Sequence, residues 1–338
     1  MSLGLASRRF APRMAAVAAV AAVGLALTGC AAGSTDSQQG EETESTAIRM
    51  ATQPWIGYGP WAIADEQGYF DDRGLDVTLT SFDGDAEVNA ALASGQADVA
   101  NVASHTALQF VENGVDVSII LLMDAATTAD AIIASGDITT IADLKGQKVA
   151  YEEGATSDLL LNYALAENGM SIDDIERVPM GASEAGAALI GNRVPVAVTY
   201  EPYITEALAQ SDSVHVLYTA AEREGLISDV LVVRNDVLEQ KPEALRSLLA
   251  AWDDAIGFYN DNTDEGRAII ATAVGAAPEE LTTAFDGVEF FTLDDNAELL
   301  DGAYLDEALP AIIEAGKVAK ILDGSAKPSD VVDSSLLK

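Results

Sequence analysis

The sequence predicts an α/β fold made of two similar series of strands and helices, followed by a helical C-terminal part. From Ala47 onward, short apolar runs alternate with helical patterns, which is typical of helices packed on largely parallel sheets. The same alternation starts again near Lys148. A chain of 338 residues is also long enough to form two hydrophobic cores.

The first series is expected to place three helices between four strands. The predicted strands are 48–52, 75–79, 98–102 and 117–123. The predicted helices are 60–69, 87–94 and 106–113. Gly95 follows the second helix and is expected to end it in the left-handed conformation that glycine tolerates.

The second series repeats this pattern. Its predicted strands are 148–151, 176–179 and 194–199, and its predicted helices are 157–168, 183–190 and 201–208. Residues 91–100 (ALASGQADVA) align with residues 188–197 (ALIGNRVPVA). Each segment is a helix end, a residue that tolerates the left-handed region (Gly95 or Asn192) and a return strand. The alignment indicates two similar lobes.

A further strand is predicted at 230–234, after which the chain is expected to be helical to its end. Residues 242–260 form a long amphipathic pattern, with apolar side chains at helical spacing. Shorter helices are predicted at 265–274, 278–286 and 297–315.

The charge and the chemistry-bearing residues exclude several classes of protein. The chain has 18 Lys and Arg against 55 Asp and Glu, so its formal net charge is −37. Such a surface repels nucleic acid, and no nucleic-acid partner is expected. Cys30 is the only cysteine, so a disulfide within the chain is impossible. The two histidines lack the spacing of a zinc site, and neither a metal nor a cofactor is expected.

The first residues are typical of an export signal. Basic Arg8, Arg9 and Arg13 precede the apolar run 14–27, which is too short to span a hydrocarbon core of about 30 Å. The sequence Leu27-Thr28-Gly29-Cys30 resembles the bacterial lipoprotein lipobox. This resemblance implies a signal peptide at 1–29 and a lipid on Cys30. The polar segment 30–46 is then expected to be a lipidated, flexible stalk. The arginine pair leaves Sec or twin-arginine export open.

Several ordered motifs between residues 47 and 260 resemble the solute-binding proteins of ABC importers for aliphatic sulfonates, taurine and nitrate. The matching segments are 55–61 (WIGYGPW), 68–70 (GYF), 74–77 (GLDV), 91–99 (ALASGQADV), 143–150 (DLKGQKVA) and 201–203 (EPY). Pro195 departs from the family, which usually has Asp in that turn.

The resemblance implies a type II periplasmic-binding fold, in which two α/β lobes hold the ligand between them. Lobe 1 would be 47–131 plus 232–338, and lobe 2 would be 136–228. Crossover strands would lie near 131–135 and 229–234. The implied protein is a monomer and not an enzyme, anchored outside the cytoplasm by its lipid. Its implied partners are a small solute, an ABC permease and the permease's ATPase.

Candidate ligand-binding residues follow from a rule for open α/β sheets, where ligands lie beyond the carboxyl ends of strands. The residues selected in this way are Trp55, Tyr58, Asp83, Ser104, His105, Thr106, Thr156, Ser157, Tyr200 and Glu201. The aromatic pair near the start is expected to form a wall, because it lies in a loop rich in Gly and Pro. The hydroxyl residues can either cap helices or donate hydrogen bonds to a solute.

The identity of the solute is left open by the sequence. The family resemblance suggests a sulfonate, taurine or nitrate. Glu152, Glu153 and Glu201 would instead favour an amine, a zwitterion or a heterocycle with N–H donors, such as a pyrimidine or thiamine precursor. A pyrimidine-synthase enzyme of the same fold would need cysteines that the chain lacks. A surface adhesin would leave the cleft motifs unexplained.

Overall fold

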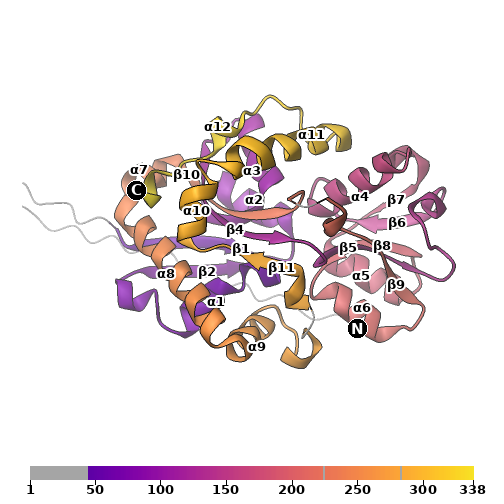
Figure 1. The fold of residues 1–338 in the computed structure, drawn as a ribbon, viewed down its shortest axis with the longest axis horizontal. Coiled ribbons are helices and arrows are strands. Elements are labelled where there is room, and N and C mark those ends of the chain that lie inside the picture. The colour runs from indigo at the N-terminus through magenta and orange to yellow at the C-terminus, as the bar shows by residue number, and fades with distance from the viewer. Residues whose placement is uncertain (1–44, 224, 282–283) are drawn as a thin grey trace, which may run out of the picture. The chain divides into compact units, whose positions relative to one another are not determined.

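Two sheets organise the part of the chain that the computed structural model describes, which is residues 45–223, 225–281 and 284–338 (Figure 1). The predicted signal peptide, Cys30 and nearly all of the predicted stalk lie outside the described residues. Among the helices of the described ranges, none is long and apolar enough to cross a membrane.

The first sheet combines strands from the two ends of the described chain. Within the described residues its order is β11 (Val288–Phe290), β4 (Val117–Ala126), β10 (Ser228–Arg234), β3 (Val99–Ala103), β1 (Ala47–Thr52) and β2 (Asp76–Ser81). β1 is parallel to β2 and β3. β10 is antiparallel to β3 and β4, and β11 is antiparallel to β4.

The second sheet is formed by the middle of the chain. Its order in the described ranges is β7 (Glu176–Pro179), β6 (Lys148–Tyr151), β8 (Val196–Tyr200), β5 (Asp130–Ser135) and β9 (Val214–Thr219). β6 is parallel to β7 and β8, whereas β5 is antiparallel to β8 and β9. The chain enters this sheet between β4 and β5 and leaves it between β9 and β10.

The α/β class is confirmed, and most strands of each sheet run in one direction. Both sheets are nevertheless mixed, because β5 and β10 follow strands of the other sheet and run antiparallel to their neighbours. An apolar run gives no information on strand direction, so the sequence pattern could not identify the reversed strands. The two strands expected as crossovers are members of the sheets, with β5 in the second and β10 in the first. The residue limits of the two lobes stay a prediction.

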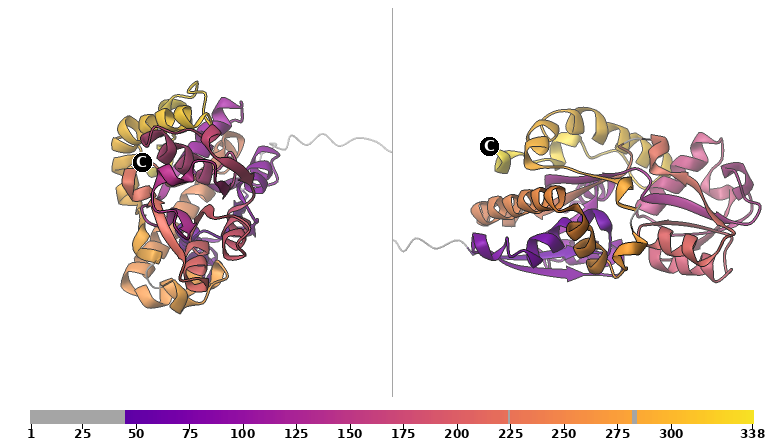
Figure 2. Two further views of the ribbon diagram at one scale, coloured as in Figure 1. Left: turned by 90° about the vertical axis from the view of Figure 1, so that its right-hand side faces the viewer. Right: turned by 60° about the horizontal axis from the view of Figure 1, so that its bottom comes forward.

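Helices cover both sides of each sheet (Figures 1 and 2). The helices of the two predicted series are α1 (Pro60–Glu66), α2 (Asp85–Ala93), α3 (Ser104–Glu112), α4 (Thr156–Glu167), α5 (Ala182–Ile190) and α6 (Tyr203–Gln210). The later helices are α7 (Asn235–Gln240), α8 (Pro242–Asp261), α9 (Thr263–Ala273), α10 (Leu293–Leu299), α11 (Leu309–Ala319) and α12 (Pro328–Val331). α8 packs on α1, and α11 contacts both α3 and α4.

Alternation along the strands explains why both faces are covered. Successive side chains of a strand point to opposite faces. In β10, Leu231 and Val233 join the core beneath α1 and α8, whereas Val230 and Val232 join the core beneath α2, α3 and α11. The long apolar runs are therefore strands buried on both faces.

Three predictions for the C-terminal part are wrong. Strand β11 was expected to be helical, and its three residues are too short to show a period. The predicted helix 278–286 is replaced by the 3-10 turns Pro278–Glu280 and Ala284–Gly287. The predicted helix 297–315 is divided between α10 and α11, with a π turn before α11. Pro310 lies in the first turn of α11, where a missing backbone N–H is tolerated.

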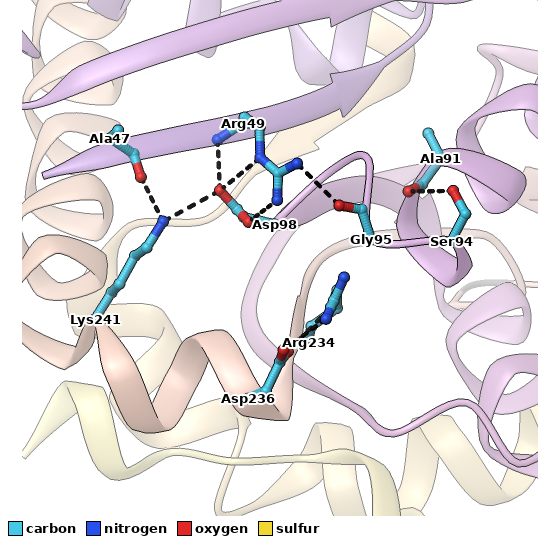
Figure 3. Close-up of polar contacts among 9 residues, drawn as sticks. All are labelled: Ala47, Arg49, Ala91, Ser94, Gly95, Asp98, Arg234, Asp236 and Lys241. Carbon is cyan, nitrogen blue, oxygen red and sulfur yellow. Dashed lines mark hydrogen bonds and ion pairs between the residues drawn. The ribbon is translucent and has the colours of Figure 1, made fainter. Parts of the chain in front are cut away.

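A buried ion cluster ties the first strand to the C-terminal part (Figure 3). The Asp98 carboxylate accepts hydrogen bonds from the Arg49 backbone and guanidinium and forms an ion pair with Lys241 at 3.3 Å. Lys241 also donates to the Ala47 carbonyl oxygen at 2.7 Å. Gly95 has the predicted left-handed φ of 75°, and an added Cβ there would lie 1.9 Å from an Arg234 nitrogen.

Candidate functional site

A small cavity is lined by residues that come from both sheets. Its free volume is about 10 Å³, far below the roughly 300–1,000 Å³ of pockets that hold drug-sized ligands. Its lining residues are Gln53, Trp55, Tyr58, Asp130, Thr156, Tyr200, Ile227 and Asp229. Three of them lie in the segment that follows β1, and the second sheet contributes the start of β5 and the end of β8. Such an arrangement can enclose a small solute on both sides.

Aromatic side chains form much of the wall. The Trp55 and Tyr200 rings meet edge to face, with centroids 5.6 Å apart and planes at 79°. The Tyr58 hydroxyl donates to an Asp229 carboxylate oxygen at 2.8 Å. Gly57 makes room for this wall, because an added Cβ would lie 2.2 Å from Trp55 Nε1 and 2.4 Å from an Asp124 carboxylate oxygen.

Four of the ten predicted ligand-binding residues line this cavity. They are Trp55, Tyr58, Thr156 and Tyr200. The other six do not: Asp83, Ser104, His105, Thr106, Ser157 and Glu201. The rule on strand ends therefore selected segments that reach this cavity, but not always the residue that faces it.

The segment 104–106 is buried at the start of α3 rather than exposed to the cavity. The Ser104 hydroxyl lies 2.8 Å from the Ser228 hydroxyl and 2.7 Å from the Tyr304 hydroxyl. His105 Nε2 lies 3.4 Å from the Thr106 hydroxyl, and burial lowers the pKa of His105 to about 4. The polar atoms of these side chains contact other side chains of the protein, and none of the three residues lines the cavity.

The remaining three predicted residues lie beside the cavity. Asp83 is exposed on the loop before α2. Ser157 is buried in the first turn of α4. The Glu201 carboxylate accepts hydrogen bonds from the Thr205 backbone and hydroxyl, both at 3.0 Å. Glu201 thus satisfies the start of its own helix, while Glu153 forms an exposed ion pair with Arg177.

Sequence analysis missed the carboxylates of the site. Asp130 and Asp229 line the cavity, and Asp124 is fully buried next to them. Asp124 and Asp229 are paired residues of the antiparallel strands β4 and β10, and Asp130 is paired with Tyr200 across β5 and β8. The sequence does show that each of these carboxylates lies at the end of an apolar run. It does not show that they lie close together, because that depends on the order of the strands in the sheets.

Burial sets the electrostatics of this cluster. Burial and the neighbouring carboxylates raise the pKa of Asp124 and of Asp130 well above the usual range. Burial also raises the pKa of Asp229 to about 6, against the opposing effect of the Tyr58 hydrogen bond. Among the described lining residues there is no Lys, Arg or His. The cavity is therefore strongly acidic.

A polar contact joins the two sides beside the cavity. The backbone N–H of Asp85, at the start of α2, donates to a Glu152 carboxylate oxygen at 3.1 Å. An added Cβ at Gly84 would lie 2.9 Å from the same oxygen. Burial and the nearby Asp85 raise the pKa of Glu152 to about 7. Glu152 thus faces the rim of the site from the second sheet.

A larger hollow, with a free volume of about 360 Å³, lies elsewhere, against the π turn before α11. Its lining is mainly apolar, with Leu122, Leu226 and Phe291 among the side chains. None of the ten predicted residues lines it. In the described ranges, no group of three or more His, Cys, Asp or Glu side chains is arranged to hold a metal ion.

Comparisons with known proteins agree with this architecture. The NMT1/THI5-like family model matches residues 56–265, which is more than half of the chain. A protein of Brucella abortus named as a binding protein is 26% identical over 272 residues, covering 78% of this chain and 83% of the relative. The taurine-binding periplasmic protein of Escherichia coli is 26% identical over 226 residues, covering 65% and 69%.

A solved structure shows the same fold. The alkanesulfonate-binding protein of Xanthomonas axonopodis pv. citri, bound to MOPS, has a TM-score of 0.70 and 18% identity. The match covers 85% of this chain and 98% of that protein. The predicted periplasmic-binding fold is confirmed. The chain belongs to the NMT1/THI5-like family and is a solute-binding protein of the ABC-importer type.

Proposed function

We propose that this protein captures one small polar solute in the cavity between its two sheets and delivers it, unchanged, to an ABC permease. The observation that carries the proposal is the lining of the cavity, to which both sheets contribute aromatic and polar side chains. A solute held in this way contacts both lobes, so closure of the lobes and binding are coupled. The ATPase of the permease would drive the transport step.

Two kinds of observation bear on the class of the solute: the names of the relatives and the side chains of the cavity. The named relatives include a taurine-binding and an alkanesulfonate-binding protein, which supports a sulfonate-like or zwitterionic solute and, by the same resemblance, nitrate. The carboxylates of Asp130 and Asp229 instead support a solute with N–H donors or positive charge. The second observation concerns the side chains of this protein itself, whereas the first concerns its relatives.

The position of the protein in the cell completes the proposal. Export by the signal at 1–29 and lipidation of Cys30 would hold a monomer outside the cytoplasm, with 30–46 as a stalk. The test is Cys30→Ser, which should move the protein from the membrane to the soluble fraction or the culture fluid. If this variant stayed with the membrane to the same extent, the proposed lipid anchor would be contradicted.

The binding role itself is tested on the purified protein. Thermal-shift screening with sulfonates, taurine, nitrate, small amines and aminopyrimidines should find a stabilising solute. Calorimetry should then give one site per chain, and mass spectrometry should recover the solute intact. A product of changed mass would favour the enzyme alternative. Absence of binding across all these classes would contradict the proposed function.

A further inference from the structure

The acidic cavity contains carboxyl groups that face no Lys, Arg or His side chain of the described lining. Asp130 is 5% exposed and lines the cavity, and its carboxylate makes no hydrogen bond or ion pair with another described residue. Asp124, which is 0% exposed, lies against the Asp229 carboxyl group and Trp55, with no hydrogen bond of good geometry to either of its oxygens in the described ranges. Buried polar groups in proteins are nearly always paired, so the Asp130 carboxylate is available to a partner from outside the chain.

The geometry of the strands concentrates negative charge at one point. Asp124 and Asp229 are direct partners across β4 and β10, and like charges in that position repel. Asp229 is 5% exposed, and its carboxylate accepts a hydrogen bond from Tyr58, with the Asp124 and Trp55 side chains also within its reach. A neutral donor such as a tyrosine hydroxyl leaves the negative charge in place. A protein gains no stability from such a cluster, which is typical of a ligand site.

The aromatic wall is suited to the same kind of ligand. Trp55, Tyr58 and Tyr200 surround the carboxylates, and the faces of aromatic rings attract cations. An anion such as a sulfonate would face these carboxylates with no basic side chain in the described lining. The buried Trp55 Nε1, which lacks a partner in the described ranges, is a single neutral donor and cannot offset that repulsion.

We infer that the solute is a small organic cation, whose positive nitrogen is held by Asp130 and Asp229 within a cage of Trp55, Tyr58 and Tyr200. This inference rests on the proposed function and specifies its substrate class. The free volume of the cavity is about 10 Å³, so the cation must be small and the two sides of the cavity must move apart to admit it. An organic cation fits better than a metal ion, because no metal-binding cluster of acidic or histidine side chains is present in the described ranges.

The experiment compares matched probes by calorimetry on the purified protein. The cations are ethylammonium, guanidinium, tetramethylammonium and choline. The uncharged isostere of choline is 3,3-dimethyl-1-butanol, and the other probes are ethanesulfonate, taurine, nitrate and Ca²⁺. At least one cation should bind at one site per chain. For choline, if it binds, the isostere should bind at least about tenfold more weakly, because it lacks the charge.

Two variants locate the effect. Asp130→Asn should weaken binding of that cation at least about tenfold while leaving the melting temperature unchanged or raised, since a buried charge is removed. Asp212→Asn is the control, because it removes a negative charge from the exposed turn before β9, and it should leave affinity unchanged. Asp229→Asn should reproduce the effect of Asp130→Asn.

The outcomes separate the two proposals. Binding only of ethanesulfonate, taurine, nitrate or Ca²⁺ would overturn the cation inference and leave solute capture standing. Cation binding that Asp130→Asn and Asp229→Asn do not weaken would also overturn it, because the cation would lie elsewhere. Failure of every probe, together with failure of the wider solute screen, would contradict the proposed function as well.

Discussion

Trp55 and Tyr200, which belong to the parts of the chain built on different sheets, meet edge to face with ring centroids 5.6 Å apart. Trp55 lies in the segment between β1 and α1, and Tyr200 is the last residue of β8. Both rings line the cavity, so one aromatic contact closes part of its wall from both sides. This contact links the packing of the two sheets to solute capture.

Truncation of either ring should weaken solute binding. Trp55→Ala and Tyr200→Ala each remove contact area and the edge-to-face contact, so affinity should fall by about 1–3 kcal/mol, or roughly 5- to 150-fold. Tyr163→Ala on α4 is the control, because Tyr163 is partly buried but does not line the cavity. Calorimetry should show normal affinity for the control. Equal affinity in all three variants would place the solute elsewhere.

Two neighbouring hydroxyls at the start of α4 should behave differently. Thr156 lines the cavity, whereas Ser157 is buried and does not. Thr156→Ala should lower affinity by about 1–2 kcal/mol with little change in melting temperature. Ser157→Ala should change stability and leave affinity intact. Calorimetry beside thermal unfolding of both variants makes the comparison, and the reverse pattern would show that Ser157 is the contact.

Thr156 and Ser157 show what the sequence can and cannot predict about the site. Both were expected to bind the solute, because a pattern of apolar runs locates the start of a helix but not the direction of each side chain. The same reasoning led to Trp55 and Tyr200, which do line the cavity. It could not find Asp130 and Asp229, since strand order brings them together over a long separation in sequence.

Replacement of the buried Asp229 carboxylate should increase the free energy of unfolding at neutral pH. The pKa of Asp229 is raised to about 6 in the folded protein, against about 3.9 in an unfolded chain. The folded state therefore binds more protons between these values, and stability contributed by this group falls as pH rises from about 4 to 6. Asp229→Asn lacks this loss, so above pH 6 it should be more stable by up to about 3 kcal/mol.

The pH profile distinguishes this effect from ordinary loss of packing. The stability difference between Asp229→Asn and the unchanged protein should shrink as the pH falls from 6 to 4. His105, whose pKa is lowered, and Glu152, whose pKa is raised, titrate in both proteins and cancel, whereas the pKa of Asp124 and of Asp130 should fall in the variant because the Asp229 charge no longer raises it. Urea unfolding across this range measures the difference. A variant that is less stable at pH 8 would show that the carboxylate is structurally required.

The ion cluster around Asp98 should matter for stability and not for binding. Asp98→Ala leaves Lys241 and the half-exposed Arg49 without their shared carboxylate, whose side chain is 4% exposed, so about 1–3 kcal/mol should be lost. The control is Asp236→Ala, which breaks the more exposed pair with Arg234 and should cost at most about 1 kcal/mol (Figure 3). Equal losses in urea unfolding would contradict this ranking.

The central claim is that the solute lies between the two sheets, and a crystal structure of the protein with its bound solute tests it most directly. The account predicts density for the solute in contact with Trp55, Thr156 and Tyr200, with a positive nitrogen beside Asp130. Density instead in the larger hollow against the π turn, among Leu122, Leu226 and Phe291, would contradict the account.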